Sequence, residues 1–270
     1  MTVEVMPDNL SEAETDQLRM AIHRLEGNSF ASRATNLLGR QVEAAGRALP
    51  PPARAIVARA AESALRAALR VAMGTIDTDS RPKSARGAHK ALAAMSGAAG
   101  GAFGLAALPV ELPISTTIML RSIAQIAREE GEDLRQPEAA LACIEVLGLG
   151  GRPPGEAAIE GGYFAIRAAL ARTVSESARF IVQRGLADEA APVLVRLVAQ
   201  IAARFGLVVS QKLAAQAIPV IGAVGGAAVN LAFIEHFQNI ARGHFTVRRL
   251  ERAYGAEAVR FDYERLRNES

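Results

Sequence analysis

The sequence predicts an all-α protein, a multi-helix bundle built around two glycine-rich apolar helical segments. Three observations support this fold class. Hydrophobic residues make up 50% of the 270 residues, they recur at helical spacing along most of the chain, and no run alternates as a half-buried strand does. Alanine is abundant whereas aromatic residues make up only 4%, and alanine combines the highest helix propensity with a small side chain.

The composition also predicts a compartment and a domain organisation. A single cysteine, Cys143, excludes an internal disulfide and is typical of a reducing compartment. Only acidic charges precede Arg19, which is the reverse of a secretory signal, so we expect a cytoplasmic protein. We expect an N-terminal helical region over 1–80 and a helical domain over 81–270, or one continuous domain, with the turn-rich stretch 74–86 as linker.

Three helices are expected before this linker. Ser11 and Glu14 have the spacing of a capping box, and the apolar residues after them recur at helical spacing, so the first helix covers 12–26. The second covers 30–49 and ends at Pro50, because proline cannot continue a helix that precedes it. The third covers 53–73.

The charge changes sign along this region. Residues 1–32 have six acidic and two basic side chains, net −4, whereas residues 33–90 have eleven basic and four acidic, net +7. Arg33, Arg40 and Arg47 are seven residues apart and share a helix face. This face is either a patch for an anionic membrane surface or a solvated face that the acidic first helix neutralises.

The two apolar segments cover 91–110 and 213–234, and neither contains a charged residue. Glycines four residues apart remove side chains from one face of each helix and allow another helix to approach closely. These are Gly97 and Gly101, Gly100 and Gly104, and Gly222 and Gly226. Each segment is either the core of a soluble bundle or an element that lies on, enters or spans a bilayer, and we favour a core or interfacial element.

Further helices follow the first apolar segment. Pro113 suits the first turn of a helix, so the next helix is expected to begin there and to cover 114–130. Pro137 is expected to open another helix in the same way. The remaining expected helices cover 137–147, 156–183, 188–204, 207–217, the second apolar segment as far as 242, 246–254 and 257–266.

Glu111 is the most unusual single residue, because it interrupts an apolar stretch between Pro109 and Pro113. A carboxylate in such surroundings must be paired, hydrogen-bonded or protonated. One interpretation makes Glu111 a catalytic proton acceptor or a binding residue paired with Arg121. The other places it just before a helix, where it accepts from free backbone N–H groups and interacts with the helix dipole.

The second apolar segment carries its own polar residues, Asn230, Glu235 and His236. Asn230 suits a hydrogen bond to a facing helix, and His236 is a weak candidate for acid–base catalysis. No metal-ligand spacing, nucleotide-binding loop or nucleophile motif occurs, so we expect no metal and no cofactor. The formal net charge of +3 and the lack of a reading motif argue against nucleic-acid binding.

Two passages resemble the EcsC protein family. They are GLAALPVELPISTTIMLRSIAQIA and IPVIGAVGGAAVNLAFIEHFQNIARGHFTVRRLERAYG, and their most specific parts are the prolines around Glu111 and the motif Ile-Pro-Val-Ile-Gly followed by Asn230. The resemblance covers about residue 85 to the C-terminus. It implies a bacterial helical protein from a family named for a component associated with an exporter and with secretion, without catalytic residues to carry over.

The leading hypothesis is a noncatalytic, membrane-associated accessory protein, peripheral at the inner face of the membrane, with an anionic membrane surface and a transporter or other membrane protein as partners. One alternative is a hydrolase-like enzyme with Glu111, Asn230 and His236 in a pocket. Another is a small integral membrane protein that spans through 91–110 and 213–234. The oligomeric state does not follow from the sequence.

Overall fold

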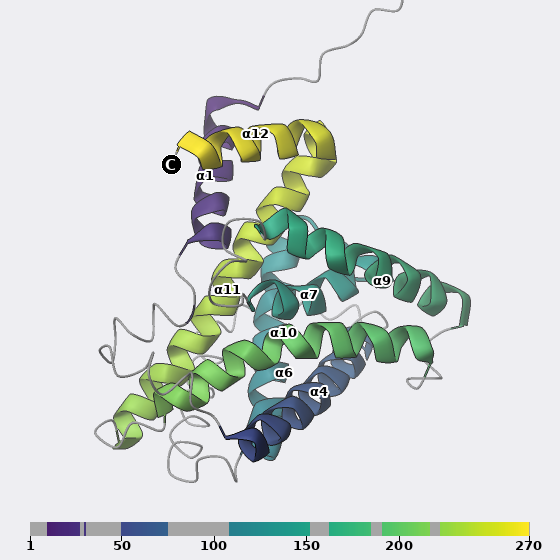
Figure 1. Cartoon of the computed structure of the whole chain (residues 1–270). Coiled ribbons are helices and arrows are strands. Elements are labelled where there is room, and N and C mark those ends of the chain that lie inside the picture. The colour runs from purple at the N-terminus through teal and green to yellow at the C-terminus, as the bar shows by residue number, and fades with distance from the viewer. Residues whose placement is uncertain are drawn as a thin grey trace, which may run out of the picture.

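The computed structural model describes residues 10–27, 30, 50–74, 108–151, 162–184, 191–216 and 222–269. This part of the chain contains helices and no strand, which confirms the predicted all-α fold class. The helices are α1 (Glu12–Glu26), α4 (Pro51–Gly74), α6 (Leu108–Glu129), α7 (Pro137–Leu149), α9 (Tyr163–Arg184), α10 (Pro192–Gln216), α11 (Gly222–Tyr254) and α12 (Ala256–Glu269) (Figure 1). The predicted helix 30–49, the linker and most of segment 91–110 lie outside the described residues.

Helix α7 lies at the centre of the bundle. It begins at Pro137, as predicted, and every residue from Ala139 to Leu149 is buried. A helix that is apolar on all sides must be enclosed on all sides, and α7 packs against α4, α6, α9, α10 and α11. The helices of the N-terminal region therefore share one core with those that follow, since α4 contacts α6, α7 and α10.

Helix α11 is the longest element and connects the two ends of the molecule (Figure 1). Its 33 residues correspond to about 50 Å at 1.5 Å per residue. The prediction of two helices, one ending near residue 242 and one starting at residue 246, was wrong. Gly243 does not end the helix, because α1 packs directly on it: a Cβ built at Gly243 lies 2.6 Å from Leu25 Cγ.

The same error was made in α10, where helices 188–204 and 207–217 were expected separately. Gly206 lies inside one continuous helix, and Ser210 Oγ donates to the Gly206 carbonyl at 2.8 Å. Glycine weakens a helix by about 1 kcal/mol relative to alanine. Burial of the α10 face from Leu194 to Ala215 against α4, α7, α9 and α11 outweighs this cost.

Helix α6 begins earlier than predicted, at Leu108, so that Pro113 lies inside it. A proline in a helix removes one backbone hydrogen bond, and here the loss falls close to the helix start. The hydroxyl of Thr117 donates to the Pro113 carbonyl at 2.8 Å, and that of Ser115 donates to the Leu112 carbonyl at 3.2 Å. Glu111 therefore lies in the first helical turn and not ahead of the helix.

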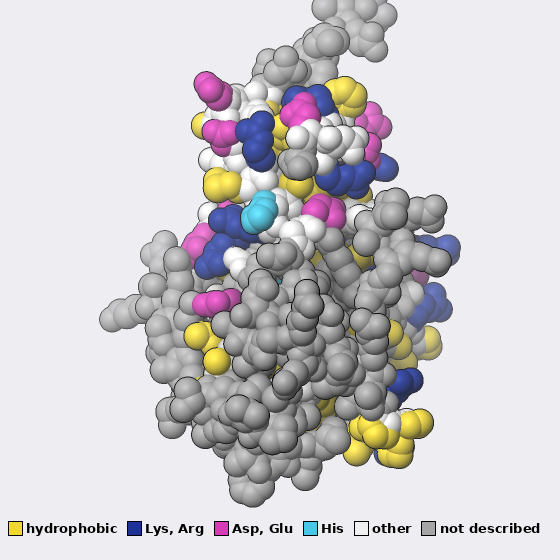
Figure 2. Space-filling view, turned by 60° about the vertical axis from the view of Figure 1, so that its left-hand side comes forward, with side chains coloured by type: hydrophobic (Ala, Val, Ile, Leu, Met, Phe, Trp, Pro, Cys, Tyr) yellow, Lys and Arg dark blue, Asp and Glu magenta, His cyan; other side chains and the backbone are white. Residues whose placement is uncertain are grey.

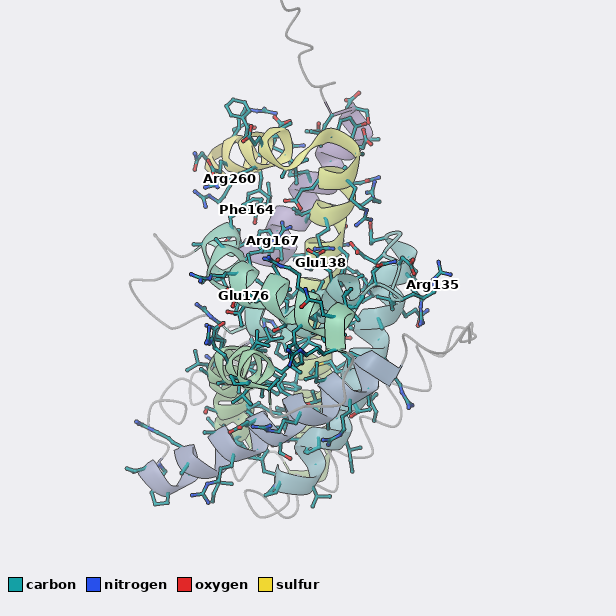
Figure 3. All side chains as sticks on the ribbon, turned by 90° about the vertical axis from the view of Figure 1, so that its right-hand side faces the viewer. Arg135, Glu138, Phe164, Arg167, Glu176 and Arg260 are labelled. Carbon is teal, nitrogen blue, oxygen red and sulfur yellow. The ribbon has the colours of Figure 1, made fainter. Side chains whose placement is uncertain are left out.

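Helices α1 and α12 close the opposite end. The predicted capping box is confirmed, with Ser11 Oγ accepting from the Glu14 amide at 3.3 Å. Glu26, the last residue of α1, accepts from the Tyr163 amide at 2.8 Å and from the Tyr263 hydroxyl at 3.0 Å, and so joins α1, α9 and α12. Arg260 also lies over the ring of Phe164, 5.7 Å from its centroid (Figure 3). Figure 2 shows basic and acidic side chains intermixed over this end.

We predict that Gly243→Ala destabilises the protein by about 1–3 kcal/mol, because the added methyl group overpacks the α1–α11 contact. Gly206→Ala is the matched control, since a Cβ there meets only Val57 Cγ1 at 4.0 Å; it should stabilise α10 by up to about 1 kcal/mol. Chemical denaturation of both variants measures the two changes. Equal effects would contradict the close contact at Gly243.

Candidate functional site

Glu111 forms a buried ion pair with a residue that the sequence analysis did not single out. The Nζ atom of Lys212, near the end of α10, donates to Glu111 Oε1 at 2.7 Å. Lys212 is 0% exposed, and its ammonium lies 4.9 Å from the ring centroid of Phe233 on α11. Burial lowers the pKa of Lys212 more than the Glu111 carboxylate raises it. The pair joins α6, α10 and α11.

The other predicted binding residues lie in different surroundings. Arg121 is exposed on α6, so the partner of Glu111 is Lys212 and not Arg121. Asn230 is fully buried in α11, and Glu235 is partly buried. His236 is buried, its Nε2 lies 3.0 Å from the Gly150 carbonyl oxygen, and its ring contacts Phe30 and Phe237.

These contacts assign structural partners to two of the three residues of the proposed catalytic pocket. Glu111 is engaged with Lys212, and His236 connects α11 to the end of α7. A catalytic role of Glu111 or His236 stays a prediction. Arg33, Arg40 and Arg47, the predicted membrane patch, lie outside the described residues.

One end of the molecule carries exposed apolar side chains. Those residues of the two glycine-rich segments that the structure describes also begin there. We call it the apolar end; it comprises the starts of α4, α6 and α11 and the end of α10 (Figures 1 and 3). Val110 and Ile114, one turn apart on α6, are 68% and 50% exposed there. Segment 91–107 precedes α6 directly in sequence, and 217–221 connects α10 to α11. Glu111, which pairs with Lys212, lies between Val110 and Ile114 in sequence and is buried.

A single described helix, α10, is long and apolar enough to cross a membrane. It was not one of the two spans considered from the sequence, although its last residues overlap segment 213–234. Only 44% of its most apolar stretch is buried, yet the helix packs against α4, α7, α9 and α11. This packing is that of a core helix.

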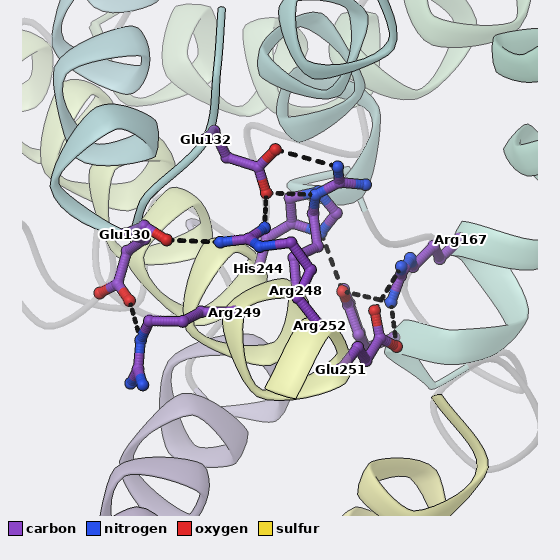
Figure 4. Close-up of polar contacts among 9 residues, drawn as sticks. Glu130, Glu132, Arg167, His244, Arg248, Arg249, Glu251 and Arg252 are labelled. Atoms are coloured by element: carbon purple, nitrogen blue, oxygen red, sulfur yellow. Dashed lines mark hydrogen bonds and ion pairs between the residues drawn. The ribbon is translucent and has the colours of Figure 1, made fainter. Parts of the chain in front are cut away.

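A second polar site lies between the loop after α6, the start of α9 and the second half of α11 (Figure 4). We call it the charge network. Arg167 makes two hydrogen bonds of 2.7 Å to Glu251, and Arg248 makes two, of 2.8 and 3.1 Å, to Glu132. The network comprises Glu130, Glu132, Arg167, Arg248, Arg249, Glu251 and Arg252. Paired forks of this kind fix the geometry of the helices that they join.

Two titratable groups next to the charge network lack partners on one side. Oε1 of Glu145 on α7 and Nε2 of His244 on α11 have no hydrogen-bond partner within the described residues. The other ring nitrogen of His244, Nδ1, lies 2.8 Å from the Tyr163 hydroxyl oxygen. Burial raises the pKa of Glu145 to about 7 despite the nearby Arg167 and Arg248. Burial, aided by the same arginines, holds the pKa of His244 well below its usual value.

The sequence predicted no functional site at these residues. Glu145 interrupts the apolar run that forms α7, which is the signal that identified Glu111, and it could have been found in the same way. The arginine partners had no such signal, because arginines are frequent along the whole chain. Their pairing depends on which helices meet.

The ionisable side chains in and near the charge network are either neutral or paired with an opposite charge. Both ionised members of each arginine–glutamate pair are satisfied, His244 is neutral at pH 7, and Cys143 is buried with its pKa raised to about 12 by burial, so that it remains a thiol. The described residues contain no group of side chains that could hold a metal ion. A groove of about 890 Å³ runs along α1 from Asp16 to Gly27 and reaches Arg267, but charges of both signs line it.

We predict a pH-dependent difference in stability between the protein and Glu145→Gln. The unfolded chain ionises Glu145 near its ordinary pKa of 4.5, whereas the folded protein holds the proton up to about pH 7. The folded state thus binds more protons in this window, so its stability falls as pH rises through it, by about 3 kcal/mol in total. Glutamine does not titrate, so the variant should gain stability relative to the parent from pH 4.5 to 7.

Denaturation at a series of pH values measures this difference, with Glu257→Gln, an exposed position on α12, as the control that should show no such trend. A difference between Glu145→Gln and the parent that does not change with pH would show that Glu145 is ionised in the folded protein.

Comparison with known families gives one match. The model described as EcsC protein family matches residues 6–250. The match begins nearer the N-terminus than the resemblance found in the sequence, which started at about residue 85. It therefore includes residues on both sides of the domain boundary expected near residue 81. Helix α12 lies after the matched residues. Searches of curated proteins and of solved structures gave no match. Because the family match covers most of the 270 residues, the chain belongs to the EcsC protein family.

Proposed function

We propose that this EcsC family protein is a noncatalytic accessory protein that binds the surface of an anionic membrane through its apolar end. The observation that carries the proposal is the exposure of Val110 and Ile114, 68% and 50%, on the first turns of α6. Two large apolar side chains that share one face of a helix and point into solvent favour contact with a partner or a lipid surface.

Sequence next to these residues extends the apolar character. Residues 91–107 lead into α6 without a charge, and the sequence 213–234, which includes the connection between α10 and α11, also has none. The start of α6, the end of α10 and the start of α11 lie at the same end of the bundle. Two long uncharged stretches next to exposed apolar side chains suit a lipid surface.

Charge favours an anionic surface. Helix α4 starts at the same end with Arg54 and Arg59, both exposed, and it has no acidic residue before Glu62. Each basic group near an anionic bilayer adds about 1 kcal/mol of attraction. Arg33, Arg40 and Arg47 precede this helix in sequence and would add to the same effect.

Peripheral binding is favoured over a membrane span. Helix α10, the single described helix that is both long and apolar enough to span, contributes Leu197, Ile201 and Phe205 to the core and carries the buried Lys212. Removing it from the bundle would expose the apolar surface of α7, so a spanning arrangement would dismantle the fold. The partner that this arrangement favours is the lipid surface itself.

A noncatalytic role is favoured over a hydrolase. Hydrolysis needs an acid–base group within reach of a substrate, whereas Glu111 is bound to Lys212 and His236 is buried against the Gly150 carbonyl. Both side chains have structural partners that account for their burial.

We predict that the protein floats with vesicles of phosphatidylglycerol and phosphatidylcholine, and that Val110→Asp with Ile114→Asp lowers the bound fraction at least tenfold, because two carboxylates replace apolar groups at the interface. Val182→Asp is the matched control, since Val182 is 71% exposed on α9, away from the apolar end. Binding should weaken with salt. Flotation that is equal in the double variant and the control would refute the proposed surface.

A further inference from the structure

The Glu111–Lys212 pair occupies a position that the proposed function leaves unexplained. Glu111 follows segment 91–107 by only three residues of helix, and Lys212 precedes the connection 217–221 by one turn. The pair therefore connects the start of α6, which follows the first glycine-rich segment, to the end of α10, where the second segment begins. Its third contact, the ring of Phe233, belongs to α11.

Lys212 is unusual because its ammonium is buried with only part of its bonding capacity used. An ammonium has three N–H donors, and Glu111 is its single hydrogen-bond acceptor among the described residues. One turn further along α10, the Nε2 atom of Gln216 is also buried without an acceptor in this part of the chain. The ammonium of Lys212 thus has N–H groups beyond the one that Glu111 accepts, and Gln216 Nε2, one turn along the same helix, has no acceptor among the described residues.

Stability alone does not require a charged pair here. Replacing a buried ion pair by apolar residues is often neutral or stabilising, whereas removing one partner strands a charge and is strongly destabilising. Leu112 and Leu213, which adjoin Glu111 and Lys212 in sequence, and Phe233, whose ring faces the ammonium, are buried and apolar, so apolar side chains would suit the site. Separating the two members would leave a buried charge without a partner and would strongly destabilise the contact between α6 and α10. We call such a pair a lock.

We propose that Glu111 and Lys212 form a lock that holds the first turns of α6 against α10 and α11, and that the phosphate group of an anionic lipid can replace Glu111 as the acceptor for Lys212. The lock rests on the proposed membrane function and deepens it. In the closed protein the carboxylate neutralises the ammonium. At an anionic surface, phosphate oxygens accept from the Lys212 ammonium in place of Glu111 and from Gln216 Nε2, and α6 with its apolar residues Val110 and Ile114 is released toward the bilayer.

Four variants test the lock. Glu111→Gln and Lys212→Met each remove one partner, the double variant E111Q/K212M removes both charges, and Glu251→Gln breaks the Arg167 pair at the other end of the molecule. Hydrogen exchange of residues 108–120, measured without lipid, reports opening of α6. Flotation with vesicles of phosphatidylglycerol and phosphatidylcholine reports membrane binding, and inorganic phosphate replaces the vesicles in a separate arm.

If the lock exists, E111Q should raise hydrogen exchange at 108–120 at least tenfold and should raise the vesicle-bound fraction. K212M should also raise exchange but should lose the preference for phosphatidylglycerol. The double variant should return to the exchange rate of the parent. E251Q should lower global stability and leave exchange at 108–120 unchanged relative to the rest of the bundle. Inorganic phosphate that opens α6 by itself would identify free phosphate, and not a lipid, as the acceptor.

Exchange at 108–120 that rises equally in E111Q and E251Q, or that rises in neither, would overturn the lock and leave the pair a structural contact. Should E111Q fail to fold, K212M and the double variant give the same comparison. Opening in E111Q without vesicle binding by any protein, the parent included, would refute the membrane function and the lipid acceptor while retaining the lock.

Discussion

Enclosure of α7 is the constraint on which the rest of the structure depends. Its residues from Ala139 to Leu149 are buried on every side, so the other helices must surround it, and α4, α6, α9, α10 and α11 do so. A helix in this position cannot expose a polar face. The single carboxyl group that α7 carries into the core, Glu145, therefore holds its proton more tightly than an exposed glutamate, because burial penalises its charged form.

The described ion pairs differ in burial between the two ends of the bundle. Near α1 and α12, arginines and glutamates form paired, partly exposed networks that connect α11 to α9 and to the loop after α6. These networks position helices and leave the surface electrically mixed. Near the apolar end, the described residues contain a buried pair, Glu111 with Lys212, next to the apolar ring of Phe233. This asymmetry suits a molecule with one end adapted to solvent and the other to a surface of low polarity.

Close packing around glycine explains why two long helices run through positions that would ordinarily end them. Gly243 in α11 admits α1 to within contact of its backbone, and Gly206 in α10 lies inside a helix whose face is buried along its length. In both cases the energy of tertiary packing exceeds the intrinsic cost of glycine in a helix. Both helices are therefore continuous because packing against neighbouring helices stabilises them through the glycine.

The sequence by itself determined the fold class, the capping box at Ser11, the proline start of α7 and the family, because these depend on local spacing and on motifs within short stretches. It also identified Glu111 as a charge that needs a partner. Tertiary structure alone decided that the partner is Lys212, 101 residues away in sequence, that α10 and α11 are single helices, and that Arg167, Arg248 and Glu251 meet near Glu145. Pairing of distant side chains depends on which helix faces come together, and helical periodicity indicates that a face is buried without indicating against what.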